Sequence, residues 1–124
     1  MSIDAFRAAV EKADLDGIVA TLAADVVLHS PVTFKPFEGR DAVRFLFSIL
    51  LKTFEDFHYV GEFVSTDGST VLRFRTRIGD REVEGIDLVH FDAEGLIDDF
   101  TVMVRPLSAA LALRDAVGSH LSAQ

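Results

Sequence analysis

The N-terminal third of the chain carries apolar residues at the spacing of α-helices. A first helix is predicted by a stripe that recurs every three or four positions, Ile3, Phe6, Val10 and Ala13. Ser2 is placed to cap it. We expect a break at Asp14 to Asp16, then a second helix that Asp14 or Asp16 caps and whose apolar face carries Ile18 and Leu22.

A short strand, a loop and a long helix are predicted next. Residues 26–30 are rich in β-branched side chains and stop at Pro31, which indicates a strand. Residues 32–39 contain proline and glycine, so we expect irregular structure there. Residues 40–54 form the strongest helix candidate. Their apolar side chains cover more than half of the helix circumference, which predicts burial on more than one side.

From Phe57 onward the hydrophobic period changes from that of a helix to that of a strand. Turn sequences at residues 66–69, 79–80 and 92–95 divide this stretch into four strands, and residues 107–121 return to helical spacing. Helices segregated from an antiparallel sheet define an α+β fold. The 124 residues suit one domain spanning residues 1–124.

The two-residue turn at residues 79–80 fixes the register of the flanking strands, because a hairpin loop of this length pairs Ile78 with Arg81. Counting back from the turn sets arginines opposite glutamates on one face of the hairpin. The other face is apolar, and Asp87 falls on it, opposite Leu72. A carboxylate in such surroundings is paired, hydrated or neutralised by a raised pKa. Asp87 is therefore the leading candidate for a functional acid.

Asp87 also has a structural alternative, in which Arg105, Thr76 or Tyr59 holds it by an ion pair or a hydrogen bond. The face of the sheet on which Asp98 lies depends on how the turn at residues 92–95 pairs the flanking strands. If Phe91 pairs with Leu96, Asp98 becomes a diagonal neighbour of Asp87 in an apolar concavity, where two carboxyl groups would raise one pKa. A one-residue bulge would instead expose Asp98 to solvent.

Composition excludes several kinds of chemistry. The chain has no cysteine, which removes disulfides, thiolate metal sites and thiol nucleophiles. The net charge of −8 argues against nucleic acid or an anionic membrane as a partner. The N-terminal residues are charged and the apolar runs are too short to span a bilayer, so we expect a cytoplasmic protein.

Histidines provide weaker candidates. His29 lies beside Ser30 and could act as an acid or base with a nearby aspartate, but the chain lacks the Gly-x-Ser-x-Gly sequence of a nucleophilic serine. The remaining histidines do not follow His29 at metal-ligand spacing, so we expect neither a metal nor a cofactor.

Several local motifs carry a family resemblance. They are the Asp14–Asp16 break, Ala24-Asp25-Val26-Val27 before Ser30-Pro31-Val32, Phe37-Glu38-Gly39-Arg40-Asp41-Ala42-Val43, Gly85-Ile86-Asp87, and Asp92-x-x-Gly95-Leu96-Ile97. With the element order, they resemble the nuclear transport factor 2-like superfamily, particularly its SnoaL-like and ketosteroid isomerase-like branches. The resemblance covers nearly the whole chain. It implies a cystatin-like cone, in which a curved antiparallel or mixed sheet wraps around N-terminal helices and encloses an apolar cavity.

In the ketosteroid isomerase-like branch, an aspartate before Pro-Val is the base, and a tyrosine and a protonated aspartate form the oxyanion hole. By this resemblance Asp87 matches the oxyanion-hole acid. Ser30 occupies the position of the base, and gapless counting puts Phe6 at the position of the tyrosine. A serine hydroxyl is too weak a base for that proton transfer, so steroid-type isomerisation by this set of residues is not expected.

Three functions remain open. The first is binding of a small apolar or aromatic molecule in the cone. The second is a cofactor-independent isomerase or cyclase, with Asp87 as acid or base on a carbonyl substrate and Asp98, His29 or Tyr59 assisting. The third is a dimeric interaction scaffold. We expect the ligand to contact seven side chains, Phe6, Ser30, Phe45, Tyr59, Phe74, Val89 and Phe100.

A homodimer is expected from the strand that carries Asp87. Ile86, Leu88 and His90 alternate with Asp87 and therefore lie on the opposite face of the sheet. Ile86 and Leu88 make this second face apolar as well, which indicates that a partner covers it. A second copy of the chain, bound through Ile86, Leu88 and His90, is the natural partner.

Overall fold

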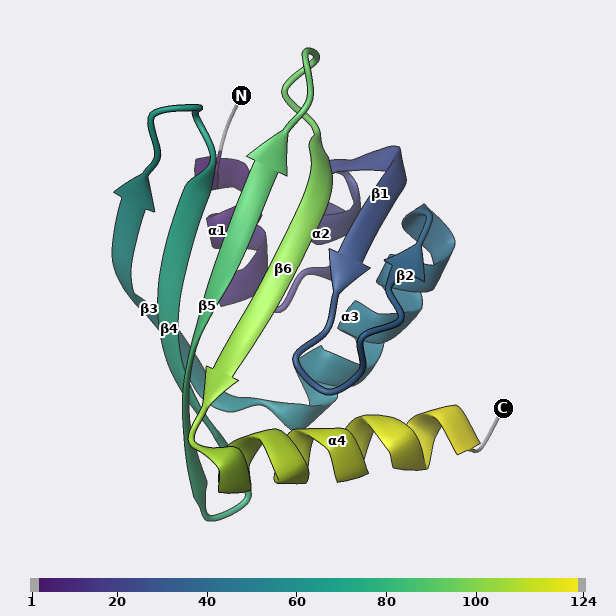
Figure 1. The fold of residues 1–124 in the computed structure, drawn as a ribbon, viewed down its shortest axis with the longest axis vertical. Helices are drawn as coiled ribbons and strands as arrows, with labels where there is room; N and C mark the ends of the chain where they lie inside the picture. Colours follow the sequence, from purple (N-terminus) through teal and green to yellow (C-terminus); the bar gives the residue numbers. More distant parts are fainter. Residues whose placement is uncertain (1–2, 123–124) are drawn as a thin grey trace.

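One six-stranded sheet with helices against one face makes up the computed structural model, which describes residues 3–122 (Figure 1). The elements in chain order are α1 (Ile3–Glu11), α2 (Leu15–Val19), β1 (Leu22–His29), β2 (Phe37–Glu38), α3 (Arg40–Thr53), β3 (Glu55–Val64), β4 (Thr70–Ile78), β5 (Arg81–Phe91), β6 (Ile97–Arg105) and α4 (Leu107–Ser122). This arrangement confirms the predicted α+β class.

The sheet is mixed. Its strand order is β2-β1-β6-β5-β4-β3, and β1 runs parallel to β6 while every other pair is antiparallel. Helices α1, α2 and α3 lie on one face of the sheet, and α4 crosses one end of it (Figure 1). The opposite face, which we call the outer face, carries no helix of the described chain.

The β4–β5 hairpin has the predicted register throughout. Ile78 pairs with Arg81, and Leu72 lies opposite Asp87. Gly79 adopts a positive φ of 61°, which the tight turn requires and glycine tolerates. The charge matching is partly confirmed: Arg75 forms an ion pair with Glu84 at 3.1 Å.

The β5–β6 hairpin differs from the simplest prediction. Phe91 pairs with Ile97 rather than Leu96, and the register shifts between His90 and Phe91. The cause is the side chain of Asp92, whose Oδ1 accepts hydrogen bonds from the backbone N–H groups of Glu94 and Leu96, both at 2.9 Å. These bonds tighten the loop, and the irregularity that follows turns Asp98 away from the cavity.

Two N-terminal boundaries also differ. The second helix spans only Leu15–Val19, and Leu22 begins β1 instead of ending the helix. Leu22 pairs with Ile97 of β6, and both are almost fully buried, so strand pairing outweighs the helical spacing. The predicted N-cap of α2 is Asp14, whose Oδ1 accepts from the Gly17 N–H at 3.1 Å. Ser2 lies outside the described residues.

Residues 37–38 were expected to be irregular and instead form β2, a short edge strand paired with β1. The main core lies between the helices and the inner face of the sheet. Phe6 of α1, Phe47 of α3 and Phe100 of β6 meet there with ring centroids 5.3–6.2 Å apart. This aromatic contact joins α1 and α3 to the sheet, and Phe47 and Phe100 also line the cavity described below.

Candidate functional site

An apolar cavity of about 210 Å³ lies between α1, α3 and the inner face of β3–β6. Its lining residues are Val10, Glu11, Ala13, Phe47, Leu50, Leu51, Phe54, Phe57, Tyr59, Phe74, Asp87, Phe100 and Val102. Only three of them carry polar side chains, and each is acidic or phenolic. The cavity is smaller than the roughly 300–1,000 Å³ typical of drug-sized ligands, which limits the occupant to a small molecule.

Asp87 provides the carboxyl group of the cavity. It comes from the middle of β5, and its residue exposure is 6%. The Tyr59 hydroxyl, from β3 on the far side of β4, donates a hydrogen bond to Asp87 Oδ2 at 3.1 Å. Within the described residues Oδ1 has no hydrogen-bond partner. Because Asp87 lines the cavity, this oxygen is available to a bound molecule.

Burial determines the protonation of this carboxyl group. Desolvation raises the pKa of Asp87 from 3.8 to about 7, and the hydrogen bond from Tyr59 partly opposes that rise. The pKa of Tyr59 lies well above its ordinary value of 10.0, first because of burial and then because of the nearby Asp87 charge. Tyr59 therefore stays protonated, while Asp87 exchanges its proton near neutral pH. The pair can donate a hydrogen bond or transfer a proton.

Aromatic rings form most of the remaining wall. Phe57 stacks on Phe74 with centroids 4.8 Å apart, and its edge meets Tyr59 at 5.1 Å. Phe54 packs against both of these phenylalanines at 5.7 and 6.0 Å. Offset-stacked, tilted and edge-on contacts are all favourable for aromatic pairs. Phe57 packs against the Tyr59 ring, whose hydroxyl binds Asp87.

Glu11, at the end of α1, lines the cavity on a solvent-exposed side, which we call its opening. Its carboxylate is 45% exposed, and Arg7 lies one turn earlier, with Nε 3.9 Å from Glu11 Oε2. Arg7 also contacts Glu62 at 3.3 Å, and its guanidinium lies over the Tyr59 ring, 5.6 Å from the centroid. Among the described lining residues, Glu11 is thus the exposed charged group, and Asp87 and Tyr59 are the polar groups of the buried part.

Comparison with known families adds to this geometry. A family model described as a SnoaL-like domain matches residues 3–100. The chain belongs to the SnoaL-like domain family. The expected resemblance to nuclear transport factor 2-like proteins is thereby confirmed.

Solved structures agree with this assignment. The SnoaL-like domain is similar to a steroid delta-isomerase from Pseudomonas aeruginosa, with 40% identity and a TM-score of 0.90 over 95% of this chain and 87% of that one. It is also similar to an uncharacterised protein with a cystatin-like fold from Silicibacter pomeroyi, with 32% identity and a TM-score of 0.91 over 97% and 84% of the two chains. No curated protein matches.

A more distant likeness concerns the fold alone. The epoxide hydrolase/cyclase-like enzyme SalBIII shares 21% identity with this SnoaL-like domain, with a TM-score of 0.70 over 82% of this chain and 86% of that one.

The structure brings four of the predicted site residues together in the cavity of this SnoaL-like domain: Asp87, Tyr59, Phe74 and Phe100. Phe6 and Val89 are 0% exposed and belong to the core, and Phe45 is partly buried and packs against that core. None of these three lines the cavity. Ser30 lines a separate small cavity of about 20 Å³, which shares Leu50, Phe54 and Val102 with the larger one.

The structure places Asp98 and His29 away from the cavity: Asp98 follows the bulge alternative, and His29 has an aspartate beside it as expected, although that aspartate is not Asp87. Asp98 Oδ1 lies 2.6 Å from His90 Nδ1 on the outer face, and this contact raises the pKa of His90. His29 Nε2 lies 3.2 Å from Asp99 Oδ2, and both side chains are about half exposed. The bulge at the start of β6 and the parallel pairing of β1 with β6 produce these outer-face pairs, away from Asp87.

Sequence reasoning missed most of the helical wall. The missed lining residues are Val10, Glu11, Ala13, Phe47, Leu50, Leu51, Phe54, Phe57 and Val102. The apolar stripes of the two helices were visible in the sequence, but a stripe does not distinguish side chains that fill the core from those that border a cavity. Glu11 gave no signal, because an acid near the end of a surface helix is ordinary.

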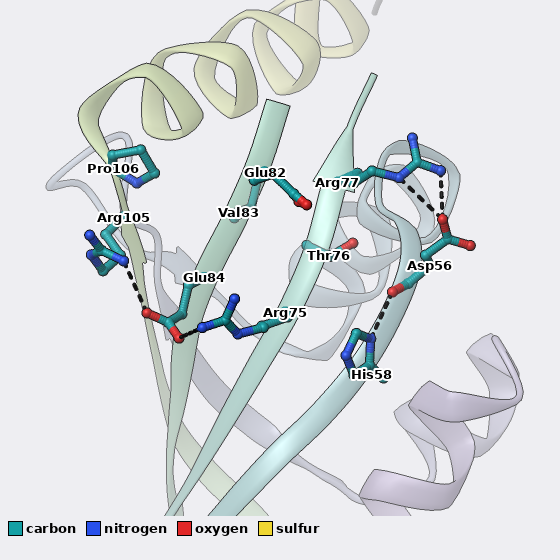
Figure 2. Close-up of a pocket in the computed structure, with 10 residues that line it drawn as sticks. All are labelled: Asp56, His58, Arg75, Thr76, Arg77, Glu82, Val83, Glu84, Arg105 and Pro106. Atoms are coloured by element: carbon teal, nitrogen blue, oxygen red, sulfur yellow. Dashed lines mark hydrogen bonds and ion pairs between the residues drawn. The ribbon is translucent and has the colours of Figure 1, made fainter. Parts of the chain in front are cut away.

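A second cavity, about 280 Å³ in volume, is open and highly charged (Figure 2). It lies on the outer face, where Glu84 contacts Arg75 and Arg105 at 3.1 Å each, and Arg77 contacts Asp56 at 2.6 Å. The arginines and acids are paired with one another and solvated. We interpret this cavity as part of a surface ion-pair network and not as the candidate site.

Two features are absent from residues 3–122. No group of three or more potential metal ligands is found there. No helix in this part of the chain is long and apolar enough to cross a membrane.

Proposed function

We propose that this SnoaL-like domain binds a small apolar or aromatic molecule, with the polar group of that molecule against Asp87. The observation that carries the proposal is the free Oδ1 of a buried carboxyl group in an otherwise apolar cavity. The aromatic wall supplies contact area, and one hydrogen bond to Asp87 supplies orientation. A neutral Asp87 donates to a carbonyl or hydroxyl oxygen, so a ligand with one such acceptor suits the site.

A cofactor-independent acid–base enzyme is the second candidate. It is supported by the raised pKa of Asp87, which suits proton transfer near neutral pH, and by the similarity to a steroid delta-isomerase. In this reading Asp87 donates a hydrogen bond or a proton to the carbonyl oxygen of the substrate. In the ketosteroid isomerase-like branch the base is an aspartate, and Ser30 occupies that position here. Another group would therefore have to remove the proton from the carbon atom of the substrate.

The test is a comparison of the wild-type protein with Asp87→Asn. We would screen small cyclic and aromatic ketones and alcohols by NMR, then measure affinity from pH 5 to 9. The proposal expects wild-type affinity to fall as the pH rises through about 7 and Asp87 ionises. The Asn variant should bind with little dependence on pH. Flat wild-type affinity across this range would contradict the role of Asp87.

The same samples separate binding from catalysis. Incubating each bound ketone in D₂O reports enzyme-dependent exchange of protons next to the carbonyl group. A binding protein leaves the exchange rate at the value of buffer. An enzyme accelerates the exchange, and Asp87→Asn abolishes the acceleration while the fold is retained.

We also propose that a second copy of the chain covers the outer face through Ile86, Leu88 and His90. Ile86 and Leu88 are half-buried there, and Met103 on the adjacent strand is 53% exposed. An unpartnered apolar stretch in the middle of a sheet is typical of an isologous dimer contact. The scaffold function and the cytoplasmic location stay predictions.

A further inference from the structure

The charge bordering the cavity has one sign. Its lining residues include the carboxyl groups of Glu11 and Asp87 but no lysine, arginine or histidine. Glu11 is partly exposed at the opening, whereas Asp87 lies in the buried part. The solvent-facing end of a molecule that fills the cavity therefore lies beside the carboxylate of Glu11.

Arg7 does not cancel this charge. Arg7 is not one of the residues that line the cavity, and its guanidinium lies over the Tyr59 ring. Its ion pair with Glu62, at 3.3 Å, is shorter than its contact with Glu11, at 3.9 Å. Two carboxylates share this one guanidinium, which leaves one net negative charge among these three groups. Tyr59 and Glu62 both belong to β3, so the ring contact and the closer ion pair of the guanidinium are with that strand.

The wall of the cavity also favours a cation. Six aromatic side chains line it, namely Phe47, Phe54, Phe57, Tyr59, Phe74 and Phe100. The faces of aromatic rings attract ammonium groups, because the ring quadrupole is negative above and below the ring plane. The whole chain carries a net charge of −8, which raises the local concentration of small cations around it.

The opening is a better place for an ammonium group than the buried end. Moving an ammonium group fully out of water costs several kcal/mol, and one partner carboxylate seldom offsets that cost. At Glu11 the group keeps part of its hydration while it gains the ion pair. Asp87 then remains neutral and donates to a hydroxyl or carbonyl oxygen at the other end of the ligand.

We propose that the ligand of this cavity is a small aromatic or alicyclic amine, whose ammonium group pairs with Glu11 and whose other end reaches Asp87. This inference rests on the proposed binding function, because it names the class of molecule bound there.

The experiment uses two probes that differ only at one end. Tyramine and tyrosol both carry a phenol hydroxyl for Asp87, and at the other end of the short chain tyramine has an ammonium group where tyrosol has an alcohol. We would measure both dissociation constants at about pH 6 by NMR titration of the ring signals of Tyr59 and the phenylalanines. A partly exposed ion pair with a cation–π contribution predicts tyramine binding about fivefold tighter than tyrosol.

Variants assign the preference to Glu11. Glu11→Gln should weaken tyramine binding about threefold or more and leave tyrosol binding unchanged. Glu94→Gln makes the same change in net charge on the exposed loop between β5 and β6 and should leave both affinities unchanged. Arg7→Gln removes the competing cation and should tighten tyramine binding, so the two variants near the opening act in opposite directions.

The outcomes separate this inference from the proposed function. If tyrosol binds as tightly as tyramine, the ligand class is wrong and the small-molecule function stands. If tyramine is preferred but Glu11→Gln and Glu94→Gln reduce that preference equally, the effect is one of net charge and the assignment to Glu11 is overturned. If neither compound binds, the proposed function fails, and this inference fails with it.

Discussion

The pKa of the Asp87 carboxyl group departs from its ordinary value without any charged partner. The neighbours of Asp87 in the cavity are aromatic and aliphatic, and its one hydrogen-bond donor is the neutral hydroxyl of Tyr59. Desolvation therefore dominates and the pKa rises to about 7, whereas a guanidinium at the same place would have lowered it. A carboxyl group in this state binds neutral acceptors below pH 7 and becomes an isolated buried anion above it.

The first prediction concerns stability and pH. The folded protein holds the Asp87 proton up to about pH 7, while the unfolded chain releases it near 3.8, so stability decreases as the pH rises through this window. Asp87→Asn removes that loss. The difference in unfolding free energy between variant and wild type should shift in favour of the variant by up to roughly 4 kcal/mol between pH 4 and 8. Urea unfolding at several pH values measures it, and parallel curves would contradict the raised pKa.

The second prediction concerns Tyr59. Its hydroxyl stabilises the ionised form of Asp87, so Tyr59→Phe should raise the pKa of Asp87 further. Carbon-detected NMR titration of the Asp87 carboxyl group reports this value directly, with Asp87→Asn as the assignment control. A pKa that falls in Tyr59→Phe would show that another group, and not this hydrogen bond, supports the carboxylate.

Single residues were predictable from the sequence to different degrees. Asp87 could be placed because a two-residue turn and the alternation of strands fix its face. Asp98 could not, because the hydrogen bonds that Asp92 makes within its own loop decide the register. Glu11 could not either, since its position at a cavity depends on how α1 packs against β3, which no local pattern encodes.

Among the elements, β5 is constrained on both of its faces, because it contributes Asp87 to the inner face of the sheet and Ile86 to the outer face. Gly85 lies between Phe74 of β4 and Met103 of β6. A Cβ atom at Gly85 would come within 2.5 Å of both the Met103 carbonyl oxygen and the Phe74 ring. The absence of a side chain there lets Phe74 lie flat against the sheet and border the cavity.

The third prediction follows from this close approach. Gly85→Ala should destabilise the protein by about 1–3 kcal/mol, because the backbone of β6 and the Phe74 ring cannot both move aside. Gly118→Ala is the matched control. A Cβ at Gly118 meets nothing within 4 Å, and alanine in a helix is favoured by about 0.5–1 kcal/mol, so this variant should be slightly more stable. Denaturant unfolding measures the stability of both variants. Equal unfolding free energies for Gly85→Ala and Gly118→Ala would contradict the prediction.

The elements themselves were largely predictable, because the hydrophobic period changes clearly from helical to strand spacing near Phe57. The boundary between α2 and β1 was not. Leu22 continues a helical stripe by its spacing, yet its pairing with Ile97 draws it into the sheet. Such pairing is a tertiary effect, and local propensity does not report it.

For the molecule as a whole, the two faces of the sheet serve different purposes. The inner face borders the cavity, and the outer face carries Ile86 and Leu88 between charged ends. Asp98 and Asp99 lie toward one end of this face, and Arg75 and Arg105 lie toward the other. Two copies related by an axis across the strands would bring opposite charges together around an apolar centre.

The fourth prediction tests this dimer. Ile86→Glu places a charge in the middle of the outer face, opposite Arg73 on the neighbouring strand, so the fold should tolerate it. The variant should be monomeric in analytical ultracentrifugation at concentrations where the wild type is dimeric. Leu111→Glu, at a 41% exposed position on α4, is the control and should stay dimeric. A wild type that is itself monomeric would exclude this interface.

The partition between the two inner cavities has a consequence for how such domains diversify. Leu50, Phe54 and Val102 separate the ligand cavity from the small space beside Ser30. Phe54 is the largest of these three side chains, so shortening it would enlarge both spaces toward each other. The size of molecule accepted is therefore adjustable by a single side chain, without any change to the sheet or to Asp87. A lineage with this fold can acquire new ligands in small steps while its framework stays constant.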